Sequence, residues 1–519
     1  QRQMCIRDRN VLTCAQMRAA DKYTIETLGV PSAELMERAG AAIAEEAEKL
    51  LREIGGRRVL AVCGGGNNGG DGWCAARFLA ERGFETAVYT LTDKLSPDCA
   101  AQRAAYEDAL SAAGEDPAVF TVFPEEKFDV VLDAVFGTGF RGAPEGKFAE
   151  TIARMNESGA KIVSADIPSG LNGDTGAFVL CVKADVTVTI GELKGGLLLG
   201  DGADVCGKIV RKDIGISLPS PAQAGLCGAA DFKNVFPPRR SNTHKGSFGR
   251  AVILAGSTAY SGAPFLSAGA ALKCGCGYTR LAVPADIFPY CVGKLPEAIL
   301  TCAPAEEGRL RYDEEFLRGL AAGANAVAVG MGCGVSKGLY DSLAFLLSEY
   351  RGTLVIDADA LTALAEYGAD ILREKSCRVI LTPHAKEFSR LCGKPLEEVL
   401  QNGGALARAF AAEYGVTVLL KGHTSLVTNG KFTIFCSEGT PALAKGGSGD
   451  VLSGVIVSLA ARGVNAMDSA ACGSWLMGRA GKLAAAEQGN EYSVCGTDVI
   501  AKLPAAISQL IAESGKGNG

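Results

Sequence analysis

The stretch VLAVCGGGNNGGDG, residues Val59–Gly72, joins an apolar run that predicts a strand to a glycine-rich loop and then to a predicted helix start. A second loop of this kind, GGSGD at Gly446–Asp450, stands far along the chain. Glycine backbone at a helix N-terminus offers free N–H groups and the positive end of the helix dipole, which suit phosphate. A carboxylate would repel phosphate, so the Asp in each loop must hold a cation, a sugar hydroxyl or a proton. The two loops therefore predict two nucleotide-handling sites.

The size and composition of the chain bound its class. At 519 residues and 53.6 kDa it predicts two domains. A hydrophobic content of 48% with 21% charged residues is ordinary for soluble α/β proteins, and the net charge of −6 argues against a nucleic-acid surface. No apolar run is long enough to span a membrane. Residues 1–9 show no pattern, and we expect them to lie outside the fold.

The cysteines predict reduced thiols rather than disulfides. There are 18 of them in a large chain rich in core residues, and no CxxC pair occurs. Only three histidines are present, which excludes a His-rich metal cluster. Buried free thiols are typical of a reducing compartment, so we expect a cytoplasmic protein.

The first half of the chain alternates short apolar runs with Ala-rich helical segments. This alternation predicts βαβ units and a doubly wound, mostly parallel sheet. Upstream, Ser32–Leu51 has apolar residues at helical spacing, and Ser32 with a Glu behind it predicts the N-cap of that helix. The expected strands are Val59–Cys63, Glu85–Leu91, Asp129–Val135, Lys161–Ala165 and Asp185–Ile190, and the expected helices between them include Trp73–Arg82 and Ala101–Ala113.

A domain boundary is predicted within Ser217–Arg240, where prolines and small residues interrupt the periodicity. A second α/β series follows, with a hairpin of Ser425–Thr428 and Phe432–Cys436 about a turn at Asn429. The other expected strands are Arg250–Ala255, Thr279–Val283, Ala326–Val329, Thr353–Ile356, Arg378–Leu381 and Val416–Leu420, and the expected helices are Asp450–Ala461 and Ala470–Ala486.

The first glycine loop carries more polar groups than close backbone approach requires. Gly64, Gly66 and Gly69 form a GxGxxG, so a dinucleotide-binding loop with Asp93 as the ribose acid is the alternative. Two further strand ends carry Asp133 and Asp166, and the carboxyl ends of parallel strands meet in one crevice. Hard cations prefer oxygen ligands, so a cation could be shared by Asn68, Asp133 and Ser169.

Four motifs in about residues 10–216 together resemble the epimerase domain of the NAD(P)H-hydrate repair enzymes: LMERAG, CGGGNNGGDG, VFGTGFRG and DIPSGL. The resemblance implies a Rossmann-like domain that interconverts the R and S forms at C6 of the hydrated nicotinamide, assisted by Asp166. It assigns a potassium ion to Asn68, Asp133 and Ser169. It assigns the substrate to Asn67, Asn68, Gly69, Gly70, Asp71, Gly137, Thr138, Gly139, Phe140, Arg141, Gly142, Ala143 and Asp166.

The second glycine loop suits phosphoryl transfer. Backbone N–H groups of Gly446–Gly449 can hold an anion, and Asp450 stands where an attacking hydroxyl must lose its proton. No GxxxxGK[ST] occurs, which disfavours a Walker-type NTPase. The pattern is similar to the GxGD element of ribokinase-like small-molecule kinases.

Other motifs of about residues 230–505 resemble the dehydratase domain of the same repair family: NTHKGSFGRAVILAGSTAYSGAP, GMGCG, DADAL, TPHAKEF and LLKGHTSLV. The resemblance implies ADP as co-substrate with Mg²⁺ at the phosphates, and Asp450 as the base. It places the hydrated substrate on Ala263, Gly332, His384 and Asp450, and the nucleotide on Lys421, Gly422, His423, Thr424, Ser425 and Gly449. The family commonly has a small hydroxyl residue where this chain has Lys445, so phosphate attraction or nucleotide preference could change there.

We therefore expect an epimerase domain over residues 10–220 and a ribokinase-like dehydratase domain over residues 228–510. Hydrated NADH, hydrated NADPH and ADP are the expected partners, with no nucleic acid or membrane, and a homo-oligomer is expected. Two alternatives stay open. One is a ribokinase-like vitamin kinase fused to a nucleotide-sensing domain. The other makes the first domain a binding module, against which the polar set Asn68, Asp133, Asp166 and Ser169 argues.

Overall fold

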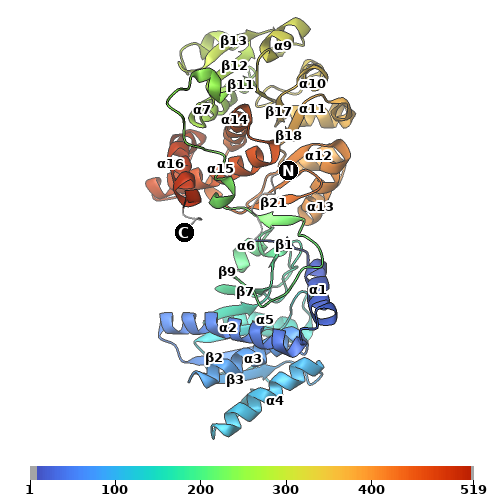
Figure 1. The fold of residues 1–519 in the computed structure, drawn as a ribbon, viewed down its shortest axis with the longest axis vertical. Helices are drawn as coiled ribbons and strands as arrows, with labels where there is room; N and C mark the ends of the chain where they lie inside the picture. Colours follow the sequence, from blue (N-terminus) through green and yellow to red (C-terminus); the bar gives the residue numbers. More distant parts are fainter. Residues whose placement is uncertain (1–8, 516–519) are drawn as a thin grey trace. The chain divides into compact units, whose positions relative to one another are not determined.

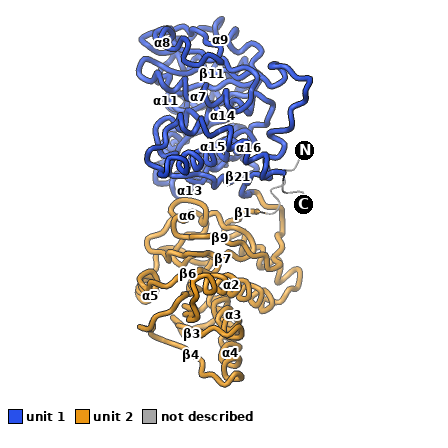
Figure 2. The backbone as a smooth tube through the Cα atoms, turned by 90° about the vertical axis from the view of Figure 1, so that its left-hand side faces the viewer, with its two compact units in different colours: residues 1–8, 224–519 blue, residues 9–223 orange. Residues whose placement is uncertain are grey.

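The computed structural model describes residues 9–515, so the expectation for residues 1–8 lies outside the described part. The chain divides into two compact units, Arg9–Gln223 and the part from Ala224 onward, drawn in orange and blue in Figure 2. The division falls within the segment 217–240, where sequence periodicity breaks. Each unit has its own sheet and its own hydrophobic core.

The N-terminal unit is built on a seven-stranded parallel sheet in the order β4-β3-β2-β5-β6-β7-β9. The chain moves outward from β2 in one direction and then returns to start again at β5 on its other side. This reversal is a topological switch point, beside which open α/β sheets bind ligands at the carboxyl ends of their strands. The strands are β2 (Arg58–Cys63), β3 (Glu85–Thr90), β4 (Ala118–Phe120), β5 (Val130–Ala134), β6 (Lys161–Ala165), β7 (Val186–Ile190) and β9 (Lys208–Lys212).

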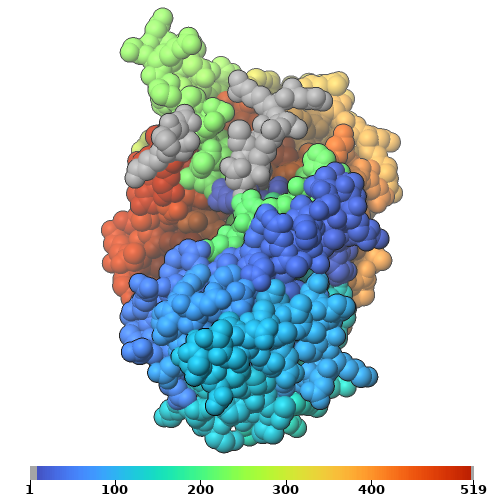
Figure 3. All heavy atoms as spheres, turned by 60° about the horizontal axis from the view of Figure 1, so that its bottom comes forward, coloured from blue at the N-terminus to red at the C-terminus, as the bar shows by residue number. Residues whose placement is uncertain are grey.

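Helices cover both faces of this sheet (Figure 1). Along β2, Val59, Ala61 and Cys63 join the core formed with α2 (Ser32–Ile54), α3 (Asn67–Glu81) and α4 (Pro97–Ala112). Leu60 and Val62 point the other way, into the core formed with α5 (Gly146–Glu157). A strand alternates its side chains between faces, so this division confirms the doubly wound arrangement. In the space-filling view, the light-blue residues of α4 form part of the outer surface of this unit (Figure 3).

Smaller elements close the carboxyl end of the same sheet. A short parallel pair joins β1 (Val11–Leu12) to β8 (Leu193–Lys194). Helix α1 (Cys14–Lys22) continues into one π-helical turn, Tyr23–Thr27, and α6 spans Gly202–Val205. These pieces bring residues near the N-terminus to the strand ends of the sheet.

The predicted N-cap of the long amphipathic helix is wrong. Pro31, at φ −60° and ψ 136°, is the N-cap of α2, and no side chain caps the helix there. Ser32 is instead its first residue, because the proline ring holds the preceding extended backbone and supplies no side-chain acceptor. The helix ends at Ile54, followed by Gly55 in the left-handed region.

The C-terminal unit contains a ten-stranded sheet in the order β10-β21-β20-β19-β18-β17-β16-β11-β12-β13. All neighbouring pairs are parallel except those of β20, which forms the predicted hairpin with β21. The Asn429 side chain accepts hydrogen bonds from Lys431 N and Phe432 N and thereby shapes the turn. The strands are β10 (Ala224–Leu226), β11 (Arg250–Leu254), β12 (Tyr278–Pro284), β13 (Ile299–Ala303), β16 (Ala326–Val329), β17 (Thr353–Ile356), β18 (Arg378–Leu381), β19 (Thr417–Leu420), β20 (Ser425–Thr428) and β21 (Thr433–Cys436), with a separate hairpin of β14 (Ala305–Glu306) and β15 (Arg309–Leu310).

Helix α14 (Ser448–Ala461) is buried along nearly its whole length. It packs closely on α7 (Ala263–Lys273), since a Cβ at Gly454 would lie 2.0 Å from Ser267 O. The other helices are α8 (Phe288–Cys291), α9 (Glu314–Ala321), α10 (Lys337–Glu349), α11 (Asp359–Tyr367), α12 (Ala385–Cys392), α13 (Leu396–Tyr414), α15 (Ala466–Gln488) and α16 (Gly496–Gly515).

Two expectations from composition meet the structure here. Within residues 9–515, no helix combines the length and apolar character needed to cross a bilayer. The cysteines of the same range are free thiols, and most are buried. The expected α/β class is confirmed in both units.

Candidate active sites

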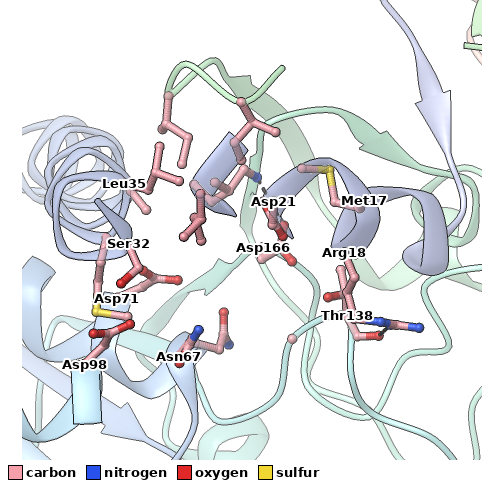
Figure 4. A pocket seen from close by; sticks show the side chains of 18 of the residues that line it. Met17, Arg18, Asp21, Ser32, Leu35, Asn67, Asp71, Asp98, Thr138 and Asp166 are labelled. Atoms are coloured by element: carbon pink, nitrogen blue, oxygen red, sulfur yellow. Dashed lines mark hydrogen bonds between the residues drawn. The ribbon is translucent and has the colours of Figure 1, made fainter. Parts of the chain in front are cut away.

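A cavity of about 280 Å³ lies at the carboxyl end of the N-terminal sheet. It collects predicted residues from three separate loops and adds side chains that the sequence did not indicate (Figure 4). The predicted residues in its lining are Asn67, Asn68, Asp71, Gly137, Thr138 and Asp166. The additions with polar side chains are Arg18, Asp21, Ser32, Asp98 and Lys194.

Not every predicted substrate contact reaches this cavity. Gly69 and Gly70 are buried, and they serve packing, since a Cβ at Gly69 would lie 1.9 Å from Gly64 O and one at Gly70 would lie 2.6 Å from Met36 Sδ. Residues 139–143 are outside the cavity lining. Within that loop, the Phe140 ring stacks on Phe136 at a centroid distance of 4.5 Å.

Asp166 is held in an unusual backbone conformation with φ +66°, rare for a residue with a side chain. Its Oδ1 accepts hydrogen bonds from Ile190 N, at 3.1 Å, and from the Lys194 ammonium. Lys194 is 1% exposed and also donates to Thr189 Oγ1 and Ile190 O. The lysine therefore fixes one oxygen of the predicted assisting carboxylate. Its signal in the sequence was a lysine inside the largely apolar run VTIGELKGGLLLG, in which Glu192 is the other charged residue.

Three further carboxyl groups share this cavity, those of Asp21, Asp71 and Asp98. Burial, followed by the charge of Asp166, raises the pKa of Asp21 to about 6. Burial raises the pKa of Asp71 well above its ordinary value, and the charges of Asp166 and Asp21 add to that rise. Asp71 was predicted from the glycine loop, whereas Asp21 belongs to α1 and carried no motif.

The three residues predicted to hold a cation lie together. Asp133 is fully buried and accepts hydrogen bonds from Ser169 N, Ser169 Oγ and Ser164 Oγ at 2.5–2.8 Å. Phe136 links the other two, since its N–H donates to Ser169 Oγ and its carbonyl accepts from Asn68 Nδ2. Burial raises the pKa of Asp133. The hydrogen bonds from Ser169 and Ser164 act in the opposite direction and reduce this rise.

In the C-terminal unit, Asp450 occupies the first turn of α14, directly behind the second glycine loop. Gly447, the N-cap of this helix, has φ +92°, and a Cβ there would lie 2.5 Å from Leu266 Cδ1. Burial and the nearby charge of Asp357 raise the pKa of Asp450 to about 6. The carboxylate thus titrates close to neutral pH, as a general base requires.

Asp357, which follows β17, connects this helix to the predicted nucleotide loop. It is 1% exposed, and its two oxygens accept from Lys421 Nζ at 2.9 Å and from Ser453 Oγ at 2.7 Å. Lys421 Nζ would also lie 3.4 Å from a Cβ at Gly449, so these two predicted residues meet. Asp357 is the first residue of the DADAL motif, but the sequence did not predict it as a site residue.

His384 is the N-cap of α12, and its Nδ1 accepts from Lys386 N and Glu387 N. Burial lowers the pKa of this imidazole, which therefore favours its neutral form. Glu387 lies 3.7 Å from Lys421 Nζ and joins His384 to the lysine. A Cβ at Gly332 would lie 3.0 Å from Ala263 Cβ, which brings that predicted pair together.

The remaining predicted nucleotide contacts follow Lys421 in the chain. Thr424 Oγ1 is buried and has no hydrogen-bond partner among the described residues. Ser425 Oγ donates to Gly422 O at 3.4 Å. The backbone of His423 lies against Gly439, since a Cβ added at Gly439 would lie 2.1 Å from His423 O. Lys445 donates to Tyr492 O at 2.7 Å, so its ammonium already has a protein partner.

Comparison with known proteins gives matches along nearly the whole chain. Family models described as "YjeF-related protein N-terminus" and "NAD(P)H-hydrate dehydratase" match residues 32–196 and 251–505. A "Bifunctional NAD(P)H-hydrate repair enzyme Nnr" from Pyrobaculum aerophilum is 36% identical, with 97% of this chain and 99% of that protein covered. The protein of the same description from Thermofilum pendens is 34% identical, with 96% of each covered.

Solved structures resemble the C-terminal half. An ADP/ATP-dependent NAD(P)H-hydrate dehydratase from Bacillus subtilis, co-crystallised with ATP and Mg²⁺, is 24% identical with a TM-score of 0.47 and covers 55% of this chain and 98% of its own. A ribokinase-like superfamily protein from Enterococcus faecalis is 23% identical with a TM-score of 0.48 and covers 57% and 99%. On the full-length relatives, this chain belongs to the family of bifunctional NAD(P)H-hydrate repair enzymes.

Proposed function

We propose that this chain repairs hydrated NADH and NADPH in two steps, epimerisation in the N-terminal unit and ADP-dependent dehydration in the C-terminal unit. Full-length similarity to bifunctional repair enzymes supports both activities. The observation that carries the proposal is that one chain contains two separate sites, one in each unit. One is the cavity with Asp166 held by Lys194, and the other is the glycine loop with Asp450 behind it.

In the epimerase, the hydrated nicotinamide would enter the cavity beside Asn67, Asn68 and Asp71. Ser96 Oγ donates to Asn67 Oδ1 at 3.1 Å and so orients that amide. The loop from Gly137 to Ala143 would close over the rest of the nucleotide. Asp166 would then accept the proton of the C6 hydroxyl, since its negative charge is held in place by the ammonium of Lys194.

A potassium ion would be held by Asn68, Asp133 and Ser169. The donor chemistry fits, because the set offers amide, carboxylate and hydroxyl oxygens, and Asn68 uses Nδ2 for the protein, which leaves Oδ1 for a cation. Such an ion supplies fixed positive charge near the substrate phosphates. Epimerase rates in potassium chloride and in choline chloride of equal ionic strength test this assignment.

In the dehydratase, ADP would transfer its terminal phosphoryl group to the C6 hydroxyl while Asp450 takes the hydroxyl proton. This transfer leaves AMP. Loss of the phosphate from C6 and of a proton from C5 then restores NAD(P)H. Backbone N–H groups of Gly446–Gly449 would neutralise charge on the transferred group. Lys421, Gly422, His423, Thr424, Ser425 and Gly449 would hold the nucleotide, and Ala263, Gly332 and His384 would hold the hydrate.

Mg²⁺ would accompany the nucleotide phosphates rather than occupy a protein cage. Within the described residues, no group of three or more His, Cys, Asp or Glu side chains is arranged to hold a metal ion. Magnesium commonly keeps several waters and binds through substrate phosphates, which fits this arrangement. The free thiols favour a cytoplasmic setting, and a homo-oligomer stays a prediction.

The deciding experiment incubates the purified chain with separate R and S hydrates of NADH, with and without ADP. We expect ADP-dependent recovery of NADH absorbance from both epimers, with a lag for the R form. No ADP-dependent recovery from the S form would refute the dehydratase. ATP-dependent phosphorylation of a pyrimidine or thiazole alcohol, without repair of the hydrate, would instead favour the vitamin-kinase alternative.

A further inference from the structure

The cavity of the N-terminal unit holds more acid–base groups than the proposed epimerisation has used. Four carboxyl groups and one ammonium line it: Asp21, Asp71, Asp98, Asp166 and Lys194. They come from α1, α3, α4, the loop after β6 and strand β8. Reversal of the configuration at C6 without net chemistry needs one group to take a proton and another to give one.

Asp166 is suited to only one of these tasks. Its Oδ1 is occupied by Ile190 N and Lys194 Nζ, and among the described residues no hydrogen bond reaches Oδ2. Lys194 has committed its three donors to Asp166, Thr189 Oγ1 and Ile190 O. Because the ammonium is saturated, it holds Asp166 in place but offers no proton to the substrate. Asp166 is therefore a base with one open oxygen.

Asp21 stands beside this base, on a different element. Figure 4 shows its carboxyl group next to that of Asp166 at the cavity, whereas Asp71 lies on the other side. Within the described residues, Asp21 makes no hydrogen bond or ion pair, although it is partly buried. Arg18, one turn earlier on α1, donates to Thr138 O at 2.7 Å and is thereby engaged elsewhere. Asp21 thus offers an open carboxyl group beside the fixed one.

The charges around Asp21 favour a protonated state. The charge of Asp166 acts on it, and Lys194 opposes this with a positive charge already paired with Asp166, while Asp71 faces it from α3. Burial and Asp166 together raise the pKa of Asp21 to about 6.

We propose that Asp21 is the second catalytic acid–base residue of the epimerase and serves the ring nitrogen while Asp166 serves the C6 hydroxyl. This role rests on the proposed function. Asp166 takes the hydroxyl proton, the C6–N1 bond breaks as a C6 carbonyl forms, and N1 takes the proton of Asp21. Rotation about C5–C6 presents the other face to N1. The C6–N1 bond then re-forms, Asp21 recovers its proton from N1, and Asp166 returns its proton to oxygen.

Asp71 fits this role less well. It lies in the second turn of α3, and Figure 4 shows it on the other side of the cavity from Asp166. Burial raises its pKa well above the ordinary value, so its protonated form is favoured and suits a hydrogen bond to substrate. The two carboxyl groups therefore divide into a proton donor and a binding group.

The test compares full-length Asp21→Asn, Asp21→Glu and a control, Glu26→Gln. Glu26 lies on the next turn of the chain, is exposed and among the described residues pairs only with Lys22, so its change removes an acid without touching the cavity. The assay follows R hydrate in excess ADP. Dehydration of the S hydrate by the same molecules reports their concentration, and thermal melting followed by circular dichroism reports folding. We expect Asp21→Asn to lower kcat of epimerisation about 100-fold with little change in KM. Asp21→Glu should restore part of the rate.

The pH profile separates catalysis from a structural role. The wild-type rate should fall as pH rises beyond the pKa of Asp21, since the donor loses its proton, and Asp21→Asn should lack this limb. A wild-type rate and limb in Asp21→Asn would overturn the assignment, and so would equal losses in Asp21→Asn and Asp21→Glu with an unchanged profile. A wild-type chain that does not exceed spontaneous epimerisation would overturn the epimerase itself.

Discussion

At the residue scale, the two predicted catalytic carboxylates meet opposite surroundings. Asp166 is paired with the buried ammonium of Lys194. Asp450 is partly buried near Asp357, and its pKa rises to about 6. The Asp357 charge is itself balanced by Lys421, which limits the repulsion. The carboxylate predicted for the epimerase is therefore fixed by a cationic partner, whereas the one predicted for the dehydratase has no such partner among the described residues and a raised pKa.

Asp450→Asn should abolish ADP-dependent recovery of NADH from the S hydrate without unfolding the chain. Loss of a general base lowers rates by about 100-fold to 10,000-fold. In the wild type the dehydration rate should fall as pH drops through about 6, because Asp450 becomes protonated. Epimerisation by the same mutant, followed by chromatography of the hydrates, is the control. Near-normal recovery would refute Asp450 as the base.

Asp71→Asn should stabilise the N-terminal unit at neutral and higher pH. Burial raises the folded pKa of Asp71 above the ordinary 3.8, so the folded state binds its proton more tightly than the unfolded state. The contribution of Asp71 is then most favourable below the unfolded pKa and becomes less favourable as pH rises toward the folded pKa. Melting of both proteins between about pH 4 and pH 8 checks this. A difference in melting temperature between the two proteins that shrinks with rising pH would contradict this prediction.

At the scale of elements, the first glycine loop is shaped by the close approach of neighbouring backbone. A Cβ at Gly64 would lie 2.2 Å from Val135 O, and one at Gly65 would lie 2.2 Å from Lys94 O. The loop therefore packs against the segments that follow β5 and β3. Its glycines are required for packing between strands as much as for ligand approach.

Gly69→Ala should disrupt this loop, whereas Gly66→Ala should be tolerated. The added methyl group at residue 69 meets Gly64 O at 1.9 Å, while nothing lies within 4 Å of a Cβ at Gly66, whose φ of −92° suits any residue. We expect a loss of about 1–3 kcal/mol for the first change, as for overpacking in a core. Urea unfolding measures both. Equal stability of the two variants would show that the loop can relax.

At the scale of the whole molecule, the two units carry separate cores and separate sheets. The N-terminal unit needs its last residues, because Ser217 N donates to Thr24 Oγ1 at 2.9 Å and Leu218 packs with Leu12 and Met17. The C-terminal unit needs Ala224–Leu226, which form the edge strand β10 beside β21. A division between residues 223 and 224 respects both requirements.

Fragments 1–223 and 224–519, produced separately, should each keep one activity. We expect the second fragment alone to recover NADH from the S hydrate with ADP, and the R hydrate to require both fragments. The measurement is NADH absorbance with each fragment, their mixture and the intact chain. A second fragment inactive on the S form, although folded by circular dichroism, would show that the sites depend on each other.

The sequence by itself determined the elements and the two glycine loops. β6, β16, β17, β18 and β20 have the bounds that alternation and flanking turns predicted, because a strand is selected by local periodicity and backbone preference. Asn68, Asp133, Asp166 and Ser169 were predicted to share one crevice, since parallel strands end at one edge. The prediction of Ser32 as the N-cap of α2 was wrong, because Pro31 holds the extended backbone that precedes the helix.

Only the tertiary structure decided which charges face one another. Asp21, Lys194 and Asp357 belong to no glycine loop, and they reach the sites through α1, the pairing of β1 with β8, and the end of β17. Burial and Coulomb interactions depend on distance through space, and residues far apart along a chain become neighbours only on folding. For that reason the partner of Asp166, and the burial that raises the pKa of Asp450, could not be predicted from local sequence.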